Sequence, residues 1–561
     1  MKHLVLAVLL GIASFQAISQ ATYLPLNGYG YHQVDRLDIK YGKVLPIPHT
    51  AVKPFNRVLL ADYAEAMHHS NLVRTPADRF NTDYLLDEST PWLDSTDRSR
   101  TPLWKVFYPE RANMFAVSAK DFELRINPVV QLNMGYEGGD DGDLLFTNTR
   151  GVELRASIKK RISFHAFVGE NQVRFPSYVR EQTHQSRYEH VNGEGYFKRY
   201  RETGVDYFAA RGSVTFNLLD HIDFQFGYDK NFIGNGFRSL YLSDNANAYL
   251  FLKMNTRVWR INYQNLFTQF IQQYDRGTDR LLPKKYGAFH HLNVNVTHFL
   301  DIGLFEGVIF ARDDHFELHY LNPIIFFRSI EQDLGSPDNA FVGLDYKANI
   351  ARRISLYGQF VFDEFNFEQI RARNGWWANK FGIQQGVKYI DVAGIPNLDA
   401  QLEFNMVRPF MYSHASNQGS QGANHTHYNQ PLAHPLGANF REFVGVVRYQ
   451  PQFLPEMMVT LTYNHAYVGR DTMGSNWGSN IFLPTREATA QMPFGNEIGQ
   501  GVTHRIHSLH TLIQYQPWHN VFVDLDVGLR RVNSDLDGQD DTDVWLGGGV
   551  RVNMPYRAYR F

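Results

Sequence analysis

The segment from Val521 to Arg530 constrains the fold of this chain most, because its residues alternate between apolar and polar side chains. In an extended strand, successive side chains point to opposite faces. The five apolar side chains therefore share one face, and Asp524, Asp526 and Arg530 share the other. A single strand of this kind fits both a soluble sandwich, whose apolar face meets a protein core, and a membrane barrel, whose apolar face meets lipid.

Repetition of this pattern favours the barrel. Alternating runs of similar length recur along the chain, for example at Ile222–Asp229, Ile354–Phe362, Phe122–Tyr136 and Val544–Asn553. Counting them gives about eighteen strands, and segments of about ten residues separated by turns are typical of transmembrane β-barrels. The sequence therefore predicts an all-β transmembrane fold, an outer-membrane antiparallel β-barrel over residues 116–561.

The connections between these strands are sorted by length, which also favours a barrel in the outer membrane. Short connections alternate with long ones, and outer-membrane barrels combine short periplasmic turns with long outer loops. The predicted short connections are 159–161, 218–221, 255–256, 395–397 and 517–520, and the long ones are 173–204, 313–339, 408–439 and 469–505.

Composition narrows the function classes. The 55 lysines and arginines against 57 aspartates and glutamates give a net charge of −2. The chain therefore lacks the excess of positive charge that nucleic-acid binding would favour. Aromatic residues make up 14% of the chain while the mean hydropathy is −0.37, which suits a barrel with a wet lumen. The chain has no cysteine, which excludes disulfides, thiolate metal sites and a lipidated cysteine.

The N-terminal region predicts a signal peptide followed by a small helical element. Residues 1–19 combine Lys2, an apolar run and the small residues Ala17 and Ser19, so the mature chain is expected to begin at Gln20. Residues 20–115 are assigned to a periplasmic segment with short helices that caps the barrel mouth. Helices are expected after Asn56, which can cap one, and from Thr75, while residues 23–50 show no sustained period.

Two groups of residues have side chains that could bind a metal ion. On a strand, Asp313, His315, Glu317 and His319 would share one face, but neighbours on a strand form a row rather than surround a point. The loop with His425, His427 and His434 could converge on an ion, although it is also rich in proline and asparagine. We predict no metal and no cofactor.

The remaining chemistry gives no support for catalysis. Acidic stretches at Asp140–Asp143 and Asp535–Asp543 lack a complete calcium-loop pattern and are interpreted as solvated loop tips. A Gly-x-Ser-x-Gly elbow or a phosphate-binding loop does not occur in a strand-to-helix setting. We therefore predict that the protein is not an enzyme.

Several motifs resemble a known family. The stretch Gly234–Asp244, the segments Leu124–Pro128 and Lys53–Arg57, the Tyr320–Pro323 turn and the run His427–Asn439 are similar to the Wzi-like capsule-assembly family. Within that family the likeness is closest to the gliding-motility branch represented by RemB of Bacteroidetes. The resemblance covers almost the whole mature chain and none of its motifs is catalytic.

The resemblance implies an eighteen-stranded outer-membrane barrel with a periplasmic helical bundle. It also implies lectin-like attachment of capsular polysaccharide at the cell surface or, for the motility branch, gliding without an enzymatic step. The implied partners are outer-membrane lipid, surface polysaccharide and gliding or secretion machinery. Near the C-terminus, Pro555 and Arg557 interrupt the alternation of apolar and polar residues that would lead up to Phe561. The end of the sequence therefore departs from the pattern of a simple barrel.

Loop aromatics and their polar neighbours are the candidate binding residues. Aromatic rings pack against the C–H faces of sugars, and planar polar groups bind their hydroxyls. Trp376 and Trp377 fit this role, and they fit equally well as anchors at the membrane interface. The full set of candidates is Trp376, Trp377, His427, Tyr428, Arg238 and Asp244.

Three functions are compatible with these sequence features. The leading hypothesis is a non-enzymatic surface protein that binds or organises exopolysaccharide, with a link to gliding. The alternative is a porin-like diffusion channel, because a barrel of this size leaves an aqueous lumen unless loops fill it. A secreted polysaccharide-degrading enzyme is the third, and release of reducing ends from capsule would reveal it.

Overall fold

The computed structural model describes residues 22–42, 49–89, 110–138, 143–184, 189–219, 221–274, 280–312, 315–324, 326–335, 338–364, 366–414, 422–472, 474–485 and 489–559. The predicted cleavage site before Gln20 lies outside them. Among these residues, no helix combines the length and apolar character needed to cross a membrane.

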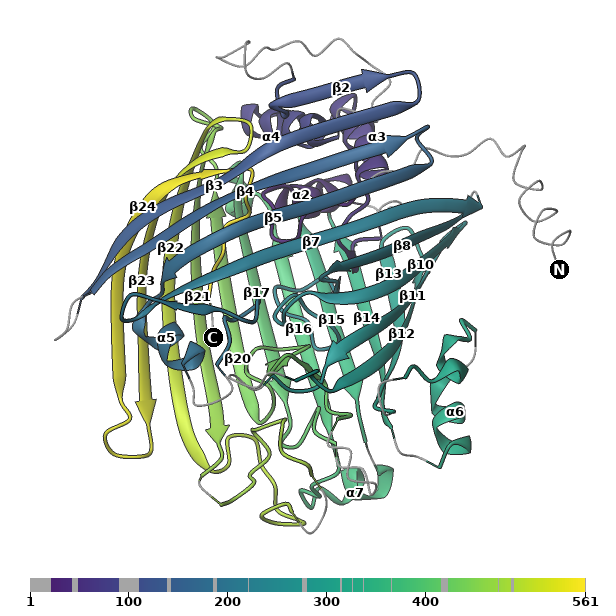
Figure 1. The fold of residues 1–561 in the computed structure, drawn as a ribbon, viewed down its shortest axis with the longest axis vertical. Coiled ribbons are helices and arrows are strands. Elements are labelled where there is room, and N and C mark those ends of the chain that lie inside the picture. The colour runs from purple at the N-terminus through teal and green to yellow at the C-terminus, as the bar shows by residue number, and fades with distance from the viewer. Residues whose placement is uncertain are drawn as a thin grey trace, which may run out of the picture.

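The chain forms a closed antiparallel barrel of eighteen strands, as predicted (Figure 1). Pairing of β24 with β3 closes it, with Val544 opposite Gly138 and Val552 opposite Val130. The wall strands are β3 (Phe122–Gly138), β4 (Asp143–Ile158), β5 (Ile162–Arg174), β7 (Gly204–Leu219), β8 (Ile222–Asp229), β10 (Tyr249–Val258), β11 (Ile261–Ile271), β12 (Lys284–Asn295), β13 (Leu300–Phe310), β14 (Asn339–Ile350), β15 (Ile354–Phe362), β16 (Phe381–Tyr389), β17 (Leu398–Val407), β20 (Phe440–Tyr449), β21 (Met457–Arg470), β22 (Val502–Trp518), β23 (Val521–Ser534) and β24 (Asp541–Val552).

Shorter elements accompany the wall. The short strand β2 (Phe115–Ala119) pairs with the beginning of β3, and the short strand β6 (Lys198–Tyr200) pairs with the beginning of β7. Two small ribbons pair β1 (Val52–Lys53) with β9 (Phe232–Ile233) and β18 (Thr426–His427) with β19 (Gln430–Pro431). The helices are α2 (Gly30–Tyr41), α3 (Arg57–His68), α4 (Pro76–Glu88), α5 (Ser177–Thr183), α6 (Phe327–Asp333) and α7 (Phe367–Ala372), with 3-10 turns η3 (Leu318–Leu321) and η4 (Val392–Gly394).

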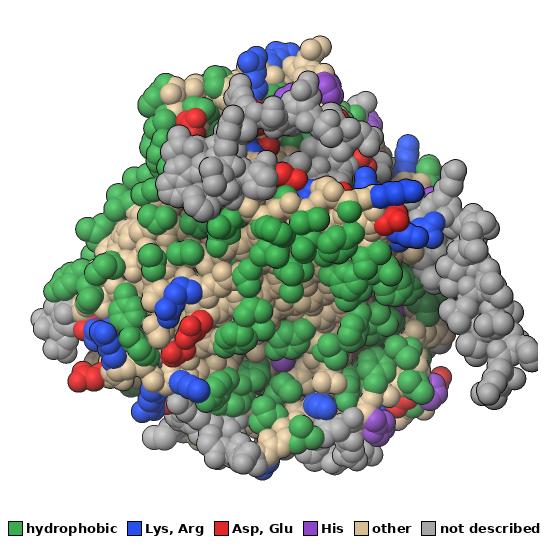
Figure 2. Space-filling model, turned by 45° about the horizontal axis from the view of Figure 1, so that its top comes forward, with side chains coloured by type: hydrophobic (Ala, Val, Ile, Leu, Met, Phe, Trp, Pro, Cys, Tyr) green, Lys and Arg blue, Asp and Glu red, His purple; other side chains and the backbone are tan. Residues whose placement is uncertain are grey.

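The two faces of β23 confirm the predicted alternation. Leu525 is 44% exposed on the outer wall, and its apolar neighbours on the same face are exposed to a similar degree. Asp524 is buried on the lumen side, where Arg551 of β24 donates a hydrogen bond to it at 2.8 Å. Apolar side chains cover much of the wall in Figure 2. The wall therefore presents an apolar surface outward and a polar surface inward, as a bilayer requires.

The sorting of loops by length is also confirmed, with one correction. Residues 255–256, predicted as a turn, lie inside β10, and the chain reverses at Trp259 and Arg260 instead. Trp259 adopts a φ of 55° there. The alternation of apolar residues continues through the true strand end, so periodicity alone could not locate the turn.

The N-terminal region forms a cap of three helices, α2, α3 and α4, at the end of the barrel that carries the short turns (Figure 1). The predicted cap residues are confirmed: the Asn56 side chain accepts from the backbone N–H of Val58, and Thr75 and Asp78 form a capping box. Helix α2, in a region without sustained periodicity, was not predicted. In the neighbouring helix α4, the Tyr84 hydroxyl donates a hydrogen bond of 2.7 Å to the side chain of Asn520, which lies in a short turn of the barrel. This contact connects the cap to the wall.

Candidate functional site

Two loop segments fold into the barrel and fill much of the lumen. These segments, residues 230–248 and 422–438, are called the lumen plug here. Their apolar side chains, such as Leu240, Tyr241 and Leu432, form one core cluster with lumen-facing residues of the wall, such as Phe289. Ser243 donates its backbone N–H to the carbonyl of Leu432 at 2.7 Å, so the two segments also bind each other.

The Gly234–Asp244 stretch is the centre of this plug. The backbone N–H of Arg238 donates to Glu403 at 3.0 Å, and its guanidinium donates to Glu442 at 2.8 Å. His434, from the second plug segment, also contacts Glu442 at 2.7 Å. A Cβ on Gly236 would come within 2.6 Å of the Glu403 carboxylate, which explains a glycine at that position. Arg238 thus holds the plug to the wall.

His425 and His427 are buried structural residues in the plug. The Nδ1 atom of His427 accepts from the backbone N–H of Ile271 at 3.0 Å, and its Nε2–H donates to the carbonyl of Ala248 at 3.0 Å. His425 contacts the carbonyl of Tyr241 through Nε2 at 2.7 Å. Burial lowers the pKa of each of these two histidines to about 3, so both are neutral at pH 7.

We expect acid to loosen the plug. In the folded plug the pKa values of His425 and His427, about 3, lie below the unfolded value of about 6.5. Between about pH 6.5 and pH 3 the unfolded segment therefore binds more protons than the folded one. The stability of the plug falls as the pH is lowered through this range. Hydrogen exchange of backbone amides in residues 422–438, corrected for intrinsic rates, should show at least about tenfold less protection at pH 4.5 than at pH 7.

Glutamine variants provide the control for this pH effect. His425→Gln and His427→Gln keep a hydrogen-bonding amide without a titrating group, so their protection should depend less on pH. His319→Gln, at an exposed position, should behave as the unchanged protein. Equal pH dependence in all three variants would assign the effect to other groups.

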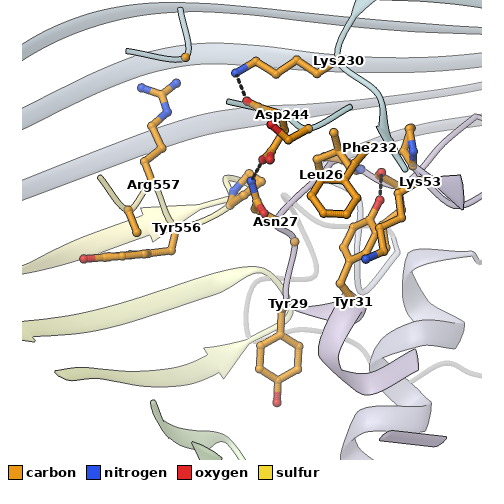
Figure 3. Close-up of a pocket in the computed structure, with 18 of the residues that line it drawn as sticks. Leu26, Asn27, Tyr29, Tyr31, Lys53, Lys230, Phe232, Asp244, Tyr556 and Arg557 are labelled. Carbon is orange, nitrogen blue, oxygen red and sulfur yellow. Dashed lines mark hydrogen bonds between the residues drawn. The ribbon is translucent and has the colours of Figure 1, made fainter. Parts of the chain in front are cut away.

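A cavity of about 490 Å³ lies between the helical cap and the plug. Figure 3 shows that three distant parts of the chain line it: Asn27, Tyr29 and Tyr31 from the cap, Lys230 and Asp244 from the plug, and Tyr556 and Arg557 from the C-terminal tail. The tail turns into the lumen after β24, where Arg557 donates to the Tyr207 hydroxyl at 2.7 Å. The break in alternation at Pro555 was the sequence signal for this turn.

Charged and aromatic groups both line the cavity. Lys230 donates to the backbone carbonyl of Asp244 at 3.0 Å, and the Asp244 carboxylate accepts from Asn27 (Figure 3). The Lys53 ammonium lies 4.7 Å from the centre of the Phe232 ring, a cation–π contact. Burial lowers the pKa of Lys53 and of Lys230 to about 8. Such a lining can bind hydroxyl and anionic groups and pack against the face of a ring.

Trp376 and Trp377 lie far from this cavity, in the connection after α7 among the long loops (Figure 1). Both are half-buried instead of fully exposed, with ring centres 6.2 Å apart in an edge-on arrangement. The backbone N–H of Trp377 donates to Pro493 at 3.0 Å, so a second long loop supports the pair. The Lys380 ammonium lies 5.4 Å from the Trp377 ring centre. We name Trp376 and Trp377 the tryptophan shelf.

The six candidates therefore do not form one site. Arg238 and Asp244 line the lumen cavity, and the tryptophan shelf lies at the long-loop end. His427 is buried in the plug, and Tyr428 stacks on Tyr274 with ring centres 4.7 Å apart. The cavity residues from the cap and tail were not among the candidates, because no local pattern places them beside the plug.

Neither histidine group forms a metal cluster among the described residues, in which no set of three or more metal-ligating side chains converges. Asp313 lies outside those residues. The expectation that 313–319 form one strand face is wrong: His319 lies in η3 and contacts Glu317 at 2.7 Å. The acidic residue Asp143 is paired with Arg174 at 2.7 Å at the start of β4, so this part of the predicted loop tip is in the wall.

Comparisons with known proteins connect the fold to the outer membrane. No protein-family model and no curated protein sequence matches the chain. Among solved structures, Wzi of Escherichia coli, an outer membrane protein involved in Group 1 capsule assembly and a carbohydrate-binding β-barrel, is 11% identical. The superposition covers 96% of this chain and 100% of Wzi, with a TM-score of 0.56.

Other barrels match less well. OccK8 (OprE) of Pseudomonas aeruginosa is 8% identical over 76% of this chain and 97% of its own, with a TM-score of 0.42. OprD of the same organism is 10% identical over 76% and 94%, with a TM-score of 0.40. The apolar outer wall, the sorted loops and the full-length likeness to Wzi agree: this chain has the fold of an outer-membrane β-barrel.

Proposed function

We propose that this protein binds polysaccharide at the bacterial cell surface and holds it there without catalysing a reaction. The observation that carries the proposal is the lumen plug. An eighteen-stranded barrel is wide enough for an aqueous channel, yet the chain uses two of its own loops to build an apolar core across that space. A structure that fills its lumen suits binding better than diffusion.

The likeness to Wzi supports the same function. Wzi is a carbohydrate-binding barrel involved in capsule assembly, and the match covers 96% of this chain and 100% of Wzi. The lumen cavity and the tryptophan shelf both offer aromatic rings beside polar groups, as carbohydrate sites do. A contribution to gliding, with motility or secretion machinery as partner, stays a prediction from the sequence resemblance alone.

The shelf is the more accessible of the two surfaces, and we assign the first contact with polysaccharide to it. Gly375, with a φ of +66°, precedes the pair, and a Cβ there would lie 2.6 Å from the backbone nitrogen of Asn496. The two long loops therefore approach each other closely at the residue before the tryptophan pair. This support holds the rings in place before a sugar arrives, which lowers the entropic cost of binding.

Removal of both indoles tests this assignment. Trp376→Ala combined with Trp377→Ala should weaken polysaccharide retention on cells by about 5- to 150-fold, since two ring contacts are together worth about 1 to 3 kcal/mol. The amount of assembled protein and its heat-modifiability should not change. Retention is measured by staining of surface polysaccharide at matched protein levels.

Trp259→Ala is the matched control, because Trp259 is exposed in a short turn at the opposite end of the barrel. It should leave retention unchanged. Should the shelf instead anchor the barrel in the membrane, the double variant would lower assembled protein and retention would fall only in proportion. Full retention at a normal protein level would exclude the shelf from the site.

A further inference from the structure

The connection between β13 and β14 folds back over the outside of the barrel. Its described part, residues 315–324 and 326–335, contains η3 and α6 and is called the outer-wall lobe here. Figure 1 shows α6 beside the wall, outside the ring of strands near β12. Tyr320 and Phe327 of the lobe are fully buried against Tyr286, Val308 and Phe310 of the wall.

These wall residues face away from the lumen. Strands β12 and β13 alternate, and Phe289 and Phe305 belong to the core cluster inside the barrel. His290 and Glu306 are their immediate neighbours in sequence, so they point to the opposite, outer face. Asn265 pairs with His290, and His290 pairs with Glu306, so the three side chains form a polar row across β11, β12 and β13.

A polar row on the outer wall is costly next to hydrocarbon, and the lobe covers it. Asn265 is 0% exposed and His290 is 5% exposed. The Phe327 ring lies over His290 with ring centres 4.0 Å apart, and the Phe327 backbone N–H donates to the Glu306 carboxylate. The lobe thus buries these polar groups and separates them from the surroundings of the barrel.

The lobe reaches most of the way down the wall. At the long-loop end, Tyr320 packs on Phe310, the last residue of β13, with ring centres 4.8 Å apart. At the other extreme, the Tyr263 hydroxyl donates to the Pro323 carbonyl at 2.6 Å, and Tyr263 is near the short-turn end of β11. The lobe therefore lies alongside the height of the wall that a bilayer covers.

The outward side of the lobe is apolar where it reaches down. Ile324 is 86% exposed and Phe326 is 55% exposed, and Leu318 and Leu321 are exposed beside them. The neighbouring wall positions Leu304 and Leu344 are exposed apolar residues of the lipid-facing surface. At this edge the lobe continues that surface, whereas Arg328, Ser329, Gln332 and Asp333 of α6 are exposed polar residues.

We propose that the apolar edge of the outer-wall lobe, formed by Leu318, Leu321, Ile324 and Phe326, lies in the bilayer and binds the acyl chains of membrane lipid. The polar row beneath it fixes the lobe to the wall, because undocking would leave those groups in hydrocarbon. The lobe widens the lipid contact of the barrel on one side only. It is independent of the polysaccharide sites described above.

The absence of cysteine makes this proposal directly testable. Ile324→Cys is labelled with a nitroxide in the full-length protein in phosphatidylcholine vesicles, and relaxation by dioxygen and by a water-soluble nickel chelate is compared. Leu304→Cys on the lipid-facing wall and Asp537→Cys in the exposed connection after β23 are the two reference positions.

The label at Ile324 should respond to dioxygen and be shielded from nickel to the same degree as the label at Leu304. Relaxation by nickel as strong as at Asp537 would place the lobe in water and overturn the proposal. Shielding from both reagents would also overturn it, since a protein surface, such as a second copy of the chain, would then cover the edge. Phe326→Cys repeats the measurement at a second position, and heat-modifiability confirms that each variant is folded.

Discussion

Replacing Leu525 with arginine is expected to destabilise the assembled barrel by about 2 to 4 kcal/mol, the cost of a cation at mid-height on the lipid face of a barrel. Leu525 is 44% exposed and lies within β23, so its side chain meets hydrocarbon directly. The measurement is the urea dependence of unfolding in vesicles, together with the heat-modifiable fraction after expression.

The matched control lies one residue further along the same strand. Asp526→Asn, on the lumen side, keeps an oxygen that can accept the 2.9 Å hydrogen bond from Trp545, so it should assemble close to the level of the unchanged protein. Equal loss in both variants would mean that the two faces of the wall are assigned wrongly.

A second large effect is expected at Arg36 of α2. Its buried guanidinium contacts three carboxylates: Asp78 of α4 at 3.3 Å, Asp391 at 2.6 Å, and Asp399 of β17. Arg36→Ala should cost about 3 to 5 kcal/mol, because removing one member of a buried ion network leaves charges without compensation. We expect the cap to separate from the barrel before the wall unfolds.

Limited proteolysis reports on this separation. In Arg36→Ala, cleavage within residues 22–89 should become fast while the wall stays resistant. Arg74→Ala, at an exposed position of the same cap, should leave the digestion pattern unchanged. Unaltered resistance in Arg36→Ala would show that other contacts, such as that between Tyr84 and Asn520, are sufficient to hold the cap.

The wall could be predicted from sequence because lipid on one side and water on the other impose a period of two on each strand. The helix starts after Asn56 and at Thr75 were equally readable, since caps are local chemistry. Helix α2 gave no such signal. Its Gln33, Arg36 and Asp38 are buried polar residues. Burial is tolerated for Arg36 because α4 and the barrel supply its carboxylate partners.

The site was less predictable than the wall, because it depends on contacts between distant segments. The Gly234–Asp244 stretch stood out by resemblance, but only the folded chain shows that Arg238 binds Glu442 in the plug. Alternation of polar residues at 313–319 suggested a strand face, whereas the segment from His315 onward belongs to the outer-wall lobe. Period-two polarity in a loop is thus a weak guide when the loop packs on an outer wall.

Binding of polysaccharide by the purified protein tests the central claim most directly. Vesicles that contain the full-length protein are incubated with surface polysaccharide isolated from the cells that produce the protein. The amount of sugar that sediments with these vesicles is compared with the amount that sediments with protein-free vesicles. We predict saturable binding that falls in the Trp376→Ala, Trp377→Ala double variant. Absence of binding, together with steady ion conductance across planar bilayers that contain the same protein, would contradict the account and identify a diffusion channel.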